Sequence, residues 1–342
     1  MMRSKKEIYS AVIILCCLFL GFLMTGSTFA EETKVWVYTK LPGVPEGLCI
    51  DSKNNLYATV SFTGELVKLN DDGTYDHIAW VPSKEDSGKG QLIGIEADNH
   101  DNIYAAYKEF SHKYENLLDP FHPDCKEATI KKSGVYKIDA KTRKVTPVLT
   151  RGDGWPVCFP DDVDIDNAGN IYVSDLTYAG IWKITPDGNV KLWSADPLLN
   201  WSEPSLPLGI NVLVLDKAQK NIYAATTTIE GRIVKIPIKK NGRAGKATIH
   251  SRGHTYFDGI EIDDEGYIYA SEPGINQIIV VPPKAGIFGI TPRKVIARNA
   301  PLEGPTSLVL RDGVLYTANL AYGWPDEAKS NTVIAIKGFS KK

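Results

Sequence analysis

Four residues with oxygen donors recur at one position of a repeated pattern: Glu46, Asp161, Asn211 and Asp258. Each opens a short run in which apolar residues alternate with others, as in β-strands. If those strands converge on one axis, the carboxylates would meet, and buried like charges need a cation to offset repulsion and desolvation. Calcium accepts about six to eight oxygen ligands, so the set predicts a calcium site, with another divalent cation as the alternative.

The same position occurs six times along the chain. It is occupied by Glu46, Ile93, Asp161, Asn211, Asp258 and Thr306. No histidine or cysteine stands there, which argues against a typical zinc or copper site, and magnesium prefers a tighter octahedron with more water. A single polar residue at a strand entrance is usually only solvated, but four oxygen donors at one register of six repeats indicate a metal centre.

The repeats themselves predict the fold. Each run is followed by turn residues and a second short strand with a tyrosine, as in Asn55-Leu56-Tyr57 and Asn170-Ile171-Tyr172. Most then show a third strand, and a polar turn such as Pro186-Asp187-Gly188 leads into a fourth. Four short strands repeated every ~40–50 residues are typical of propeller blades. We therefore predict an all-β fold, a six-bladed β-propeller of four-stranded blades.

Successive first positions are separated by 47, 68, 50, 47 and 48 residues. The long second interval indicates an insertion in blade two, between Phe110 and Lys132. An additional strand at Lys34–Tyr38 is expected to join blade six, so that the N-terminal strand closes the ring. We expect one propeller domain over residues 31–342.

These motifs resemble the SMP-30/gluconolactonase/luciferin-regenerating-enzyme-like propeller family over essentially the whole chain after the leader. The matching residues are Pro45-Glu46-Gly47, Pro160-Asp161-Asp162, Ile210-Asn211-Val212 and Phe257-Asp258-Gly259. The resemblance implies that Glu46, Asn211 and Asp258 hold the metal. Most of the family has an Asn-Asp pair in blade three, whereas this chain has Asp161-Asp162, which is similar to a calcium-dependent lactonase branch.

The resemblance implies hydrolysis of a lactone or related ester, in which calcium polarises the carbonyl and a carboxylate acts as general base. Asp161 and Asp258 are the candidate bases, and Asp161 is favoured because it replaces the usual asparagine. Its alternative role is that of a further metal ligand. His254 is a candidate proton shuttle, or else a solvated loop residue. His122, in the blade-two insertion, belongs to a candidate lid or to a surface excursion.

One departure bears on the substrate. Sugar-lactone members have an arginine two residues before the blade-three position, and this chain has Phe159. Together with Trp155, Trp201 and Trp324 it favours a larger, hydrophobic lactone or ester, unless these aromatics serve packing. Two alternatives stay open: a phosphotriesterase-like hydrolase, and a non-catalytic calcium-dependent ligand-binding propeller. No motif for an organic cofactor is present.

The first thirty residues predict export. Arg3, Lys5 and Lys6 precede the uncharged segment 8–30, which ends in Thr-Phe-Ala, so we expect a cleaved signal peptide or else an uncleaved anchor. The protein is then secreted or periplasmic. A net charge of -2 argues against nucleic acid as a partner. We expect a monomer acting on a small molecule, with no membrane contact after cleavage.

Three cysteines follow the leader. Cys49 lies within an apolar strand pattern and is predicted to be a buried free thiol. Cys125 and Cys158 fall in loops, and an oxidising compartment would allow them to pair.

Overall fold

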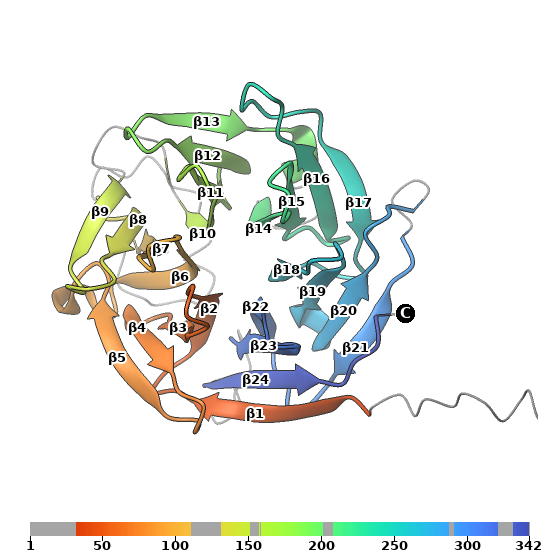
Figure 1. Cartoon of the computed structure of the whole chain (residues 1–342), viewed down its shortest axis with the longest axis horizontal. Helices are drawn as coiled ribbons and strands as arrows, with labels where there is room; N and C mark the ends of the chain where they lie inside the picture. The colour runs from red at the N-terminus through yellow and green to blue at the C-terminus, as the bar shows by residue number, and fades with distance from the viewer. Residues whose placement is uncertain are drawn as a thin grey trace, which may run out of the picture.

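The computed structural model describes residues 32–110, 131–150, 157, 159–200, 208–286, 291–320 and 331–341. These residues form six four-stranded antiparallel sheets, which surround a central axis as the blades of a β-propeller (Figure 1). No α-helix occurs in the described ranges, only the short 3-10 helices η1 (Lys84–Asp86), η4 (Pro197–Leu199) and η5 (Pro273–Ile275). The predicted fold is confirmed.

Within each blade the strands follow chain order from the axis outward. Blade one contains β2 (Pro45–Ile50), β3 (Leu56–Val60), β4 (Glu65–Leu69) and β5 (Tyr75–Trp80). Blade two contains β6 (Gly90–Ala97), β7 (Ile103–Glu109), β8 (Gly134–Ile138) and β9 (Val145–Thr150). Blade three contains β10 (Pro160–Ile165), β11 (Ile171–Asp175), β12 (Gly180–Ile184) and β13 (Val190–Ser194).

The second half of the ring repeats the plan. Blade four contains β14 (Ile210–Leu215), β15 (Asn221–Thr226), β16 (Arg232–Pro237) and β17 (Thr248–Arg252). Blade five contains β18 (Ile260–Ile262), β19 (Ile268–Glu272), β20 (Gln277–Val281) and β21 (Lys294–Arg298). Blade six contains β22 (Pro305–Arg311), β23 (Val314–Asn319), β24 (Thr332–Lys337) and, outermost, β1 (Lys34–Lys40).

Strand β1 closes the ring, as predicted. It pairs antiparallel with β24, from Lys34 opposite Lys337 to Lys40 opposite Thr332. The first described strand therefore completes the last blade and lies beside blade one (Figure 1). Main-chain hydrogen bonds thus join the N-terminal strand of the propeller to its C-terminal strand.

The turn between the first and second strands has a common chemistry. In blade one the Asp51 carboxylate accepts the main-chain N–H groups of Lys53 at 2.9 Å and Asn55 at 2.8 Å. The Asp98, Asp166 and Asp263 carboxylates accept main-chain N–H groups in the same way. Aspartate favours such local hydrogen bonds, which explains why the repeat is so regular at this point.

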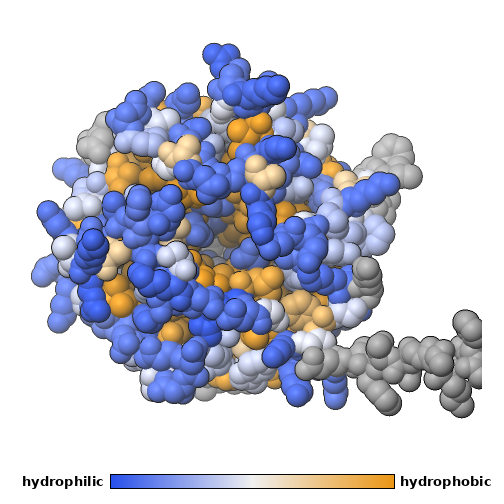
Figure 2. Space-filling model, in the orientation of Figure 1, coloured by the Kyte–Doolittle hydropathy of each residue, from blue (hydrophilic) through white to orange (hydrophobic). Residues whose placement is uncertain are grey.

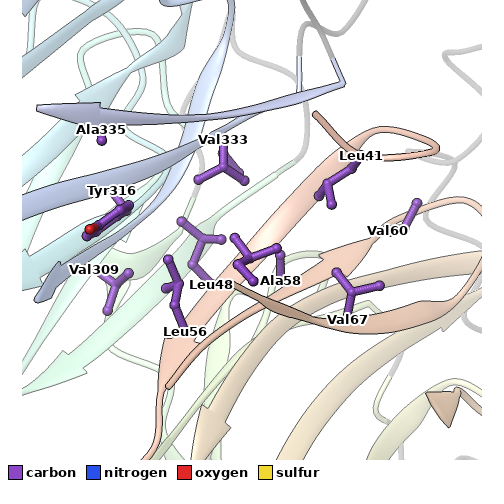
Figure 3. Packing of buried hydrophobic residues seen from close by; sticks show 12 residues of the cluster. Leu41, Leu48, Leu56, Ala58, Val60, Val67, Val309, Tyr316, Val333 and Ala335 are labelled. Atoms are coloured by element: carbon purple, nitrogen blue, oxygen red, sulfur yellow. The ribbon is translucent and has the colours of Figure 1, made fainter. Parts of the chain in front are cut away.

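The core consists of apolar layers between neighbouring blades. The layer between blades six and one includes Leu48, Leu56 and Val67 from one side and Val309 and Val333 from the other (Figure 3). Alternation along each strand sends one set of side chains toward each neighbour. Both faces of every sheet are thus covered, and the inner strands are held around the axis.

Cys49 is a buried free thiol, as predicted. Cys125 and Cys158, the leader 1–30 and most of the blade-two insertion lie outside the described residues. Within those residues, no helix is long and apolar enough to cross a membrane.

Candidate metal centre and active site

The predicted ring positions coincide with interruptions of the inner strands. In five blades the pairing of the first and second strands shifts, between Pro45 and Leu48 in blade one and at the equivalent points of blades two, three, four and six. In blade five, Asp258 precedes β18, and its main-chain N–H donates to the Ser271 carbonyl at 3.3 Å. A β-bulge turns a side chain away from its regular direction in the strand, and the ring residues lie at such interruptions near the ends of their blades.

Glycines allow the bulges of neighbouring blades to approach closely. A Cβ on Gly47 would lie 2.1 Å from the Ile93 carbonyl oxygen, and one on Gly259 would lie 2.2 Å from that of Thr306. A Cβ on Gly94 would lie 2.3 Å from Oδ1 of Asp162. These contacts leave no room for a side chain, which explains why glycine follows three of the ring positions.

Hydroxyls on the second strands stabilise three of the bulges. The main-chain N–H groups of Gly47, Asp162 and Gly259 donate to Thr59 Oγ1 at 2.8 Å, Ser174 Oγ at 2.9 Å and Ser271 Oγ at 2.8 Å. All three hydroxyl residues are fully buried. The bulge frees an N–H from the strand ladder, and the hydroxyl satisfies it.

The structure brings the ring carboxylates into one electrostatic environment. Glu46, Asp161 and Asp258 are 6%, 5% and 9% exposed. Burial and the neighbouring Asp161 and Asp258 charges raise the pKa of Glu46 well above its usual range. Burial and the Asp258 charge do the same to the pKa of Asp161, and burial raises the pKa of Asp258 to about 7. The three groups therefore favour a positive charge among them.

Asn211 contributes a neutral oxygen. Its Nδ2 donates to Thr227 Oγ1 at 3.1 Å, which fixes the orientation of the amide. Oδ1 of Asn211, Oδ2 of Asp161 and Oδ1 of Asp258 are all buried without a hydrogen-bond partner. Buried polar atoms are normally satisfied, so three unsatisfied oxygens at equivalent ring positions fit a cation.

These side chains have not converged into a closed metal cage. No group of three or more His, Cys, Asp and Glu side chains in the described ranges is arranged to hold a metal ion. The fourth ring oxygen belongs to an asparagine, Asn211, and so lies outside any such group. The unsatisfied oxygens of Asp161, Asn211 and Asp258 and the burial of the ring are what indicate a cation.

The remaining predicted residues are placed differently. The Thr306 hydroxyl donates to the main-chain oxygen of Glu46, so it serves the backbone. His254 is exposed, its main-chain N–H donates to Glu272 Oε1 at 2.7 Å, and no hydrogen bond or ion pair joins its imidazole to a described residue. Phe159 is buried against Ile93 and two leucines. His122, Trp155, Trp201 and Trp324 lie outside the described residues.

A second set of carboxylates follows the ring and was missed in the sequence. Glu96, Asp164 and Glu261 stand three residues after ring positions and are partly buried. Burial and the Asp164 charge raise the pKa of Glu96, while burial raises those of Asp164 to about 6 and Glu261 to about 7. Their common spacing of three residues after a ring position is the feature of the sequence that could have revealed them.

Asp164 of this set, and Asp162 next to the ring residue Asp161, have hydrogen-bond partners in the next blade. Asp164 accepts the main-chain N–H of Leu215 at 2.6 Å, and Asp162 accepts that of Leu213 at 3.1 Å. Both donors belong to β14, the inner strand of the next blade. The inner edge of a blade has unpaired N–H groups, and these side chains satisfy some of them.

Viewed along the axis, the disc has a central depression with hydrophobic residues around it and mainly hydrophilic outer turns (Figure 2).

Comparison with known proteins adds independent information. The family profile described as SMP-30/Gluconolactonase/LRE-like region matches residues 123–293, half of the chain. No curated protein sequence matches the chain.

Several solved structures share the fold. A gluconolactonase from Xanthomonas campestris is 12% identical, with 92% of this chain and 93% of that chain covered and a TM-score of 0.62. The calcium-binding protein regucalcin from Agrobacterium tumefaciens is 14% identical, with 90% and 95% covered and a TM-score of 0.61. Virginiamycin B lyase from Staphylococcus aureus is 12% identical, with 90% and 99% covered and a TM-score of 0.54. At these identities the likeness shows the fold alone.

Proposed function

This chain belongs to the SMP-30/gluconolactonase/LRE-like family, and we propose that it is an exported, calcium-dependent hydrolase of a lactone or related ester. The observation that carries the proposal is the set of unsatisfied buried oxygens of Asp161, Asn211 and Asp258 at equivalent ring positions. The family is named for SMP-30, gluconolactonase and LRE, and a calcium-binding regucalcin shares the fold, which supports the proposed reaction and metal.

Glu46, Asp161, Asn211 and Asp258 would hold the cation. When bound, calcium would supply Lewis-acid polarisation of the substrate carbonyl and offset the charge of the ring. The chain itself holds the ring side chains at fixed bulges and buries them, so that little water competes with the substrate.

A carboxylate of the ring then takes a proton from the attacking water. Asp161 is the favoured base, with Asp258 as the alternative, because each is a buried carboxylate of the ring, next to where the cation would be held. The two roles of ligand and base are separable by experiment, since a carboxylate-to-amide change keeps an oxygen ligand and removes the base.

Export is proposed from the N-terminal segment. The charged start, the uncharged segment 8–30 and the small residue at its end support delivery to the cell exterior or periplasm. Calcium is commonly available there at concentrations that suit weak sites, about 10⁻⁴–10⁻³ M for extracellular modules. Separation of cells from medium or periplasm, with N-terminal sequencing, tests this part.

The main experiment measures calcium binding and turnover together. Purified protein is assayed against aromatic and aliphatic lactones, esters and phosphotriesters, with and without chelator, beside Glu46→Gln, Asp161→Asn and the surface control Asp264→Asn. We expect calcium-dependent lactone or ester hydrolysis, lost in Asp161→Asn with calcium still bound, and lost in Glu46→Gln together with calcium affinity.

Other outcomes separate the alternatives. Turnover of phosphotriesters alone would replace the lactonase by a phosphotriesterase. Tight calcium binding without turnover of any substrate would leave a calcium-dependent binding propeller. Absence of calcium binding would refute the metal centre itself.

A further inference from the structure

Tyr256 lies two residues before Asp258, on a segment held between two strands. The main-chain N–H of Phe257 donates to the Thr226 carbonyl of β15 at 3.3 Å, and that of Asp258 donates to the Ser271 carbonyl of β19 at 3.3 Å. Phe257 is fully buried in the apolar core between blades four and five. Neighbouring side chains of such a segment leave it on opposite sides, so Tyr256 and Asp258 share the side away from that core.

The phenol ring of Tyr256 is positioned by packing. A Cβ placed on Gly274 of η5 would lie 3.3 Å from Tyr256 Cε1, so the ring lies close against this short helix. Tyr256 is half-buried, and its hydroxyl makes no hydrogen bond with any residue in the described ranges. A tyrosine hydroxyl has a pKa of about 10, so it is protonated at neutral pH and can donate a hydrogen bond.

The equivalent positions of the other blades show why this hydroxyl is distinctive. They are occupied by Val44, Gln91, Phe159, Gly209 and Gly304. The two glycines belong to blades four and six, on either side of blade five, so neither supplies a side chain beside Tyr256. None of the six positions has a charged residue, which suits an uncharged ligand.

We propose that Tyr256 is a further residue of the site, whose hydroxyl donates a hydrogen bond to an oxygen of a bound uncharged lactone or ester next to Asp258. This inference rests on the proposed function for its ligand class. The proton is shared in a hydrogen bond and is not transferred. A half-buried donor that has no hydrogen-bond partner among the described residues, two residues before a ring carboxylate, gains a partner when the substrate binds.

The test compares Tyr256→Phe with the wild type and with Tyr178→Phe. Tyr178 is 45% exposed in the turn between β11 and β12, so it is a matched control for loss of a phenol hydroxyl. Two probes are used: dihydrocoumarin, an uncharged aromatic lactone, and its lactam counterpart, which resists hydrolysis. Binding of the lactam is measured by calorimetry in the presence of calcium, and calcium affinity and the urea midpoint are measured separately.

We expect Tyr256→Phe to weaken lactam binding and to lower kcat/KM for the lactone by about tenfold each, the effect of one hydrogen bond at the upper end of its range. Calcium affinity, the urea midpoint and the Tyr178→Phe control should be unchanged. Equal lactam binding in Tyr256→Phe and wild type would overturn the proposal, as would a loss of calcium affinity, which would make Tyr256 a structural residue.

The design separates this inference from the proposed function. If no lactone or ester is hydrolysed but the lactam binds and Tyr256→Phe weakens it, the hydrolase is refuted and the Tyr256 contact stands. If the lactone is hydrolysed and Tyr256→Phe changes neither constant, the hydrolase stands and the Tyr256 contact is refuted. If the wild type neither binds the lactam nor hydrolyses the lactone, both fail.

Discussion

Replacing Asp258 by asparagine should make the metal-free protein more stable at neutral pH. Asp258 is 9% exposed and has a buried oxygen without a hydrogen-bond partner. Burial raises its pKa from 3.8 to about 7. A carboxyl group with a raised pKa is easier to keep protonated in the folded state than in the unfolded chain, so ionising it at neutral pH costs folding free energy.

The pKa shift sets the size and pH window of the effect. The folded protein binds more protons than the unfolded chain between pH 3.8 and about 7, so metal-free stability falls as pH rises through that window. A shift of about three units corresponds to about 4 kcal/mol as an upper bound. Channel water and movement of Glu46 and Asp161 reduce this, and we expect a gain of about 2–4 kcal/mol for Asp258→Asn at pH 8.

The assay is urea unfolding followed by tryptophan fluorescence, in chelator, at pH 8 and at pH 4. The Asn variant should be more stable than the wild type at pH 8, and at pH 4 the difference should fall below about 1 kcal/mol, because there the carboxyl is protonated in the folded state and only partly ionised in the unfolded chain. The control Asp264→Asn removes a surface ion pair with Lys217 and should change stability by less than about 1 kcal/mol at either pH.

Calcium should reduce this advantage of the variant. At a hundredfold excess over its dissociation constant it stabilises the wild type by about 2.7 kcal/mol, while the variant, short of one ligand charge, gains less. An Asn variant that is less stable than the wild type in chelator at pH 8 would refute the reasoning, because Asp258 would then be stabilising without any cation.

Three further changes test the framework of the site. Gly94→Ala should lower the free energy of unfolding in urea by about 1–3 kcal/mol, since the added Cβ would lie 2.3 Å from Asp162 Oδ1 and 2.7 Å from the Asp161 carbonyl oxygen. Unchanged stability would mean that blades two and three are not in contact at this point. Ser174→Ala should cost about 1–3 kcal/mol by leaving the Asp162 N–H unsatisfied, and Ser174→Thr, which keeps the hydroxyl, should recover part of the loss. Burial raises the pKa of the Cys49 thiol and shields it from reagents. Peptide mapping after iodoacetamide treatment at pH 8 should therefore find Cys49 unmodified in folded protein and modified in urea. Labelling of Cys49 in folded protein would contradict its burial.

The sequence alone was sufficient for the fold. The signals are local: the alternation of Leu48, Ile50 and their counterparts appears in all six repeats, an Asp-to-Asn turn follows it in four of them, and four of the five intervals are 47–50 residues long. The repeats place Glu46, Asp161, Asn211 and Asp258 at one register, and equivalent positions in equivalent blades must face one axis. Even the closing strand was evident, since β1 had no other blade to join.

Tertiary structure decided which of those positions share an environment and what surrounds them. The like-charge interactions of Glu46, Asp161 and Asp258, the hydrogen bond that orients Asn211 and the glycine contacts between blades join residues from different repeats, and no local pattern encodes such distances. The same holds for Thr306, whose hydroxyl serves the Glu46 main chain, for His254, which is exposed, and for Phe159, which packs against Ile93. A side chain's direction at a bulge depends on the neighbouring blade, and that neighbour exists only once the ring has closed.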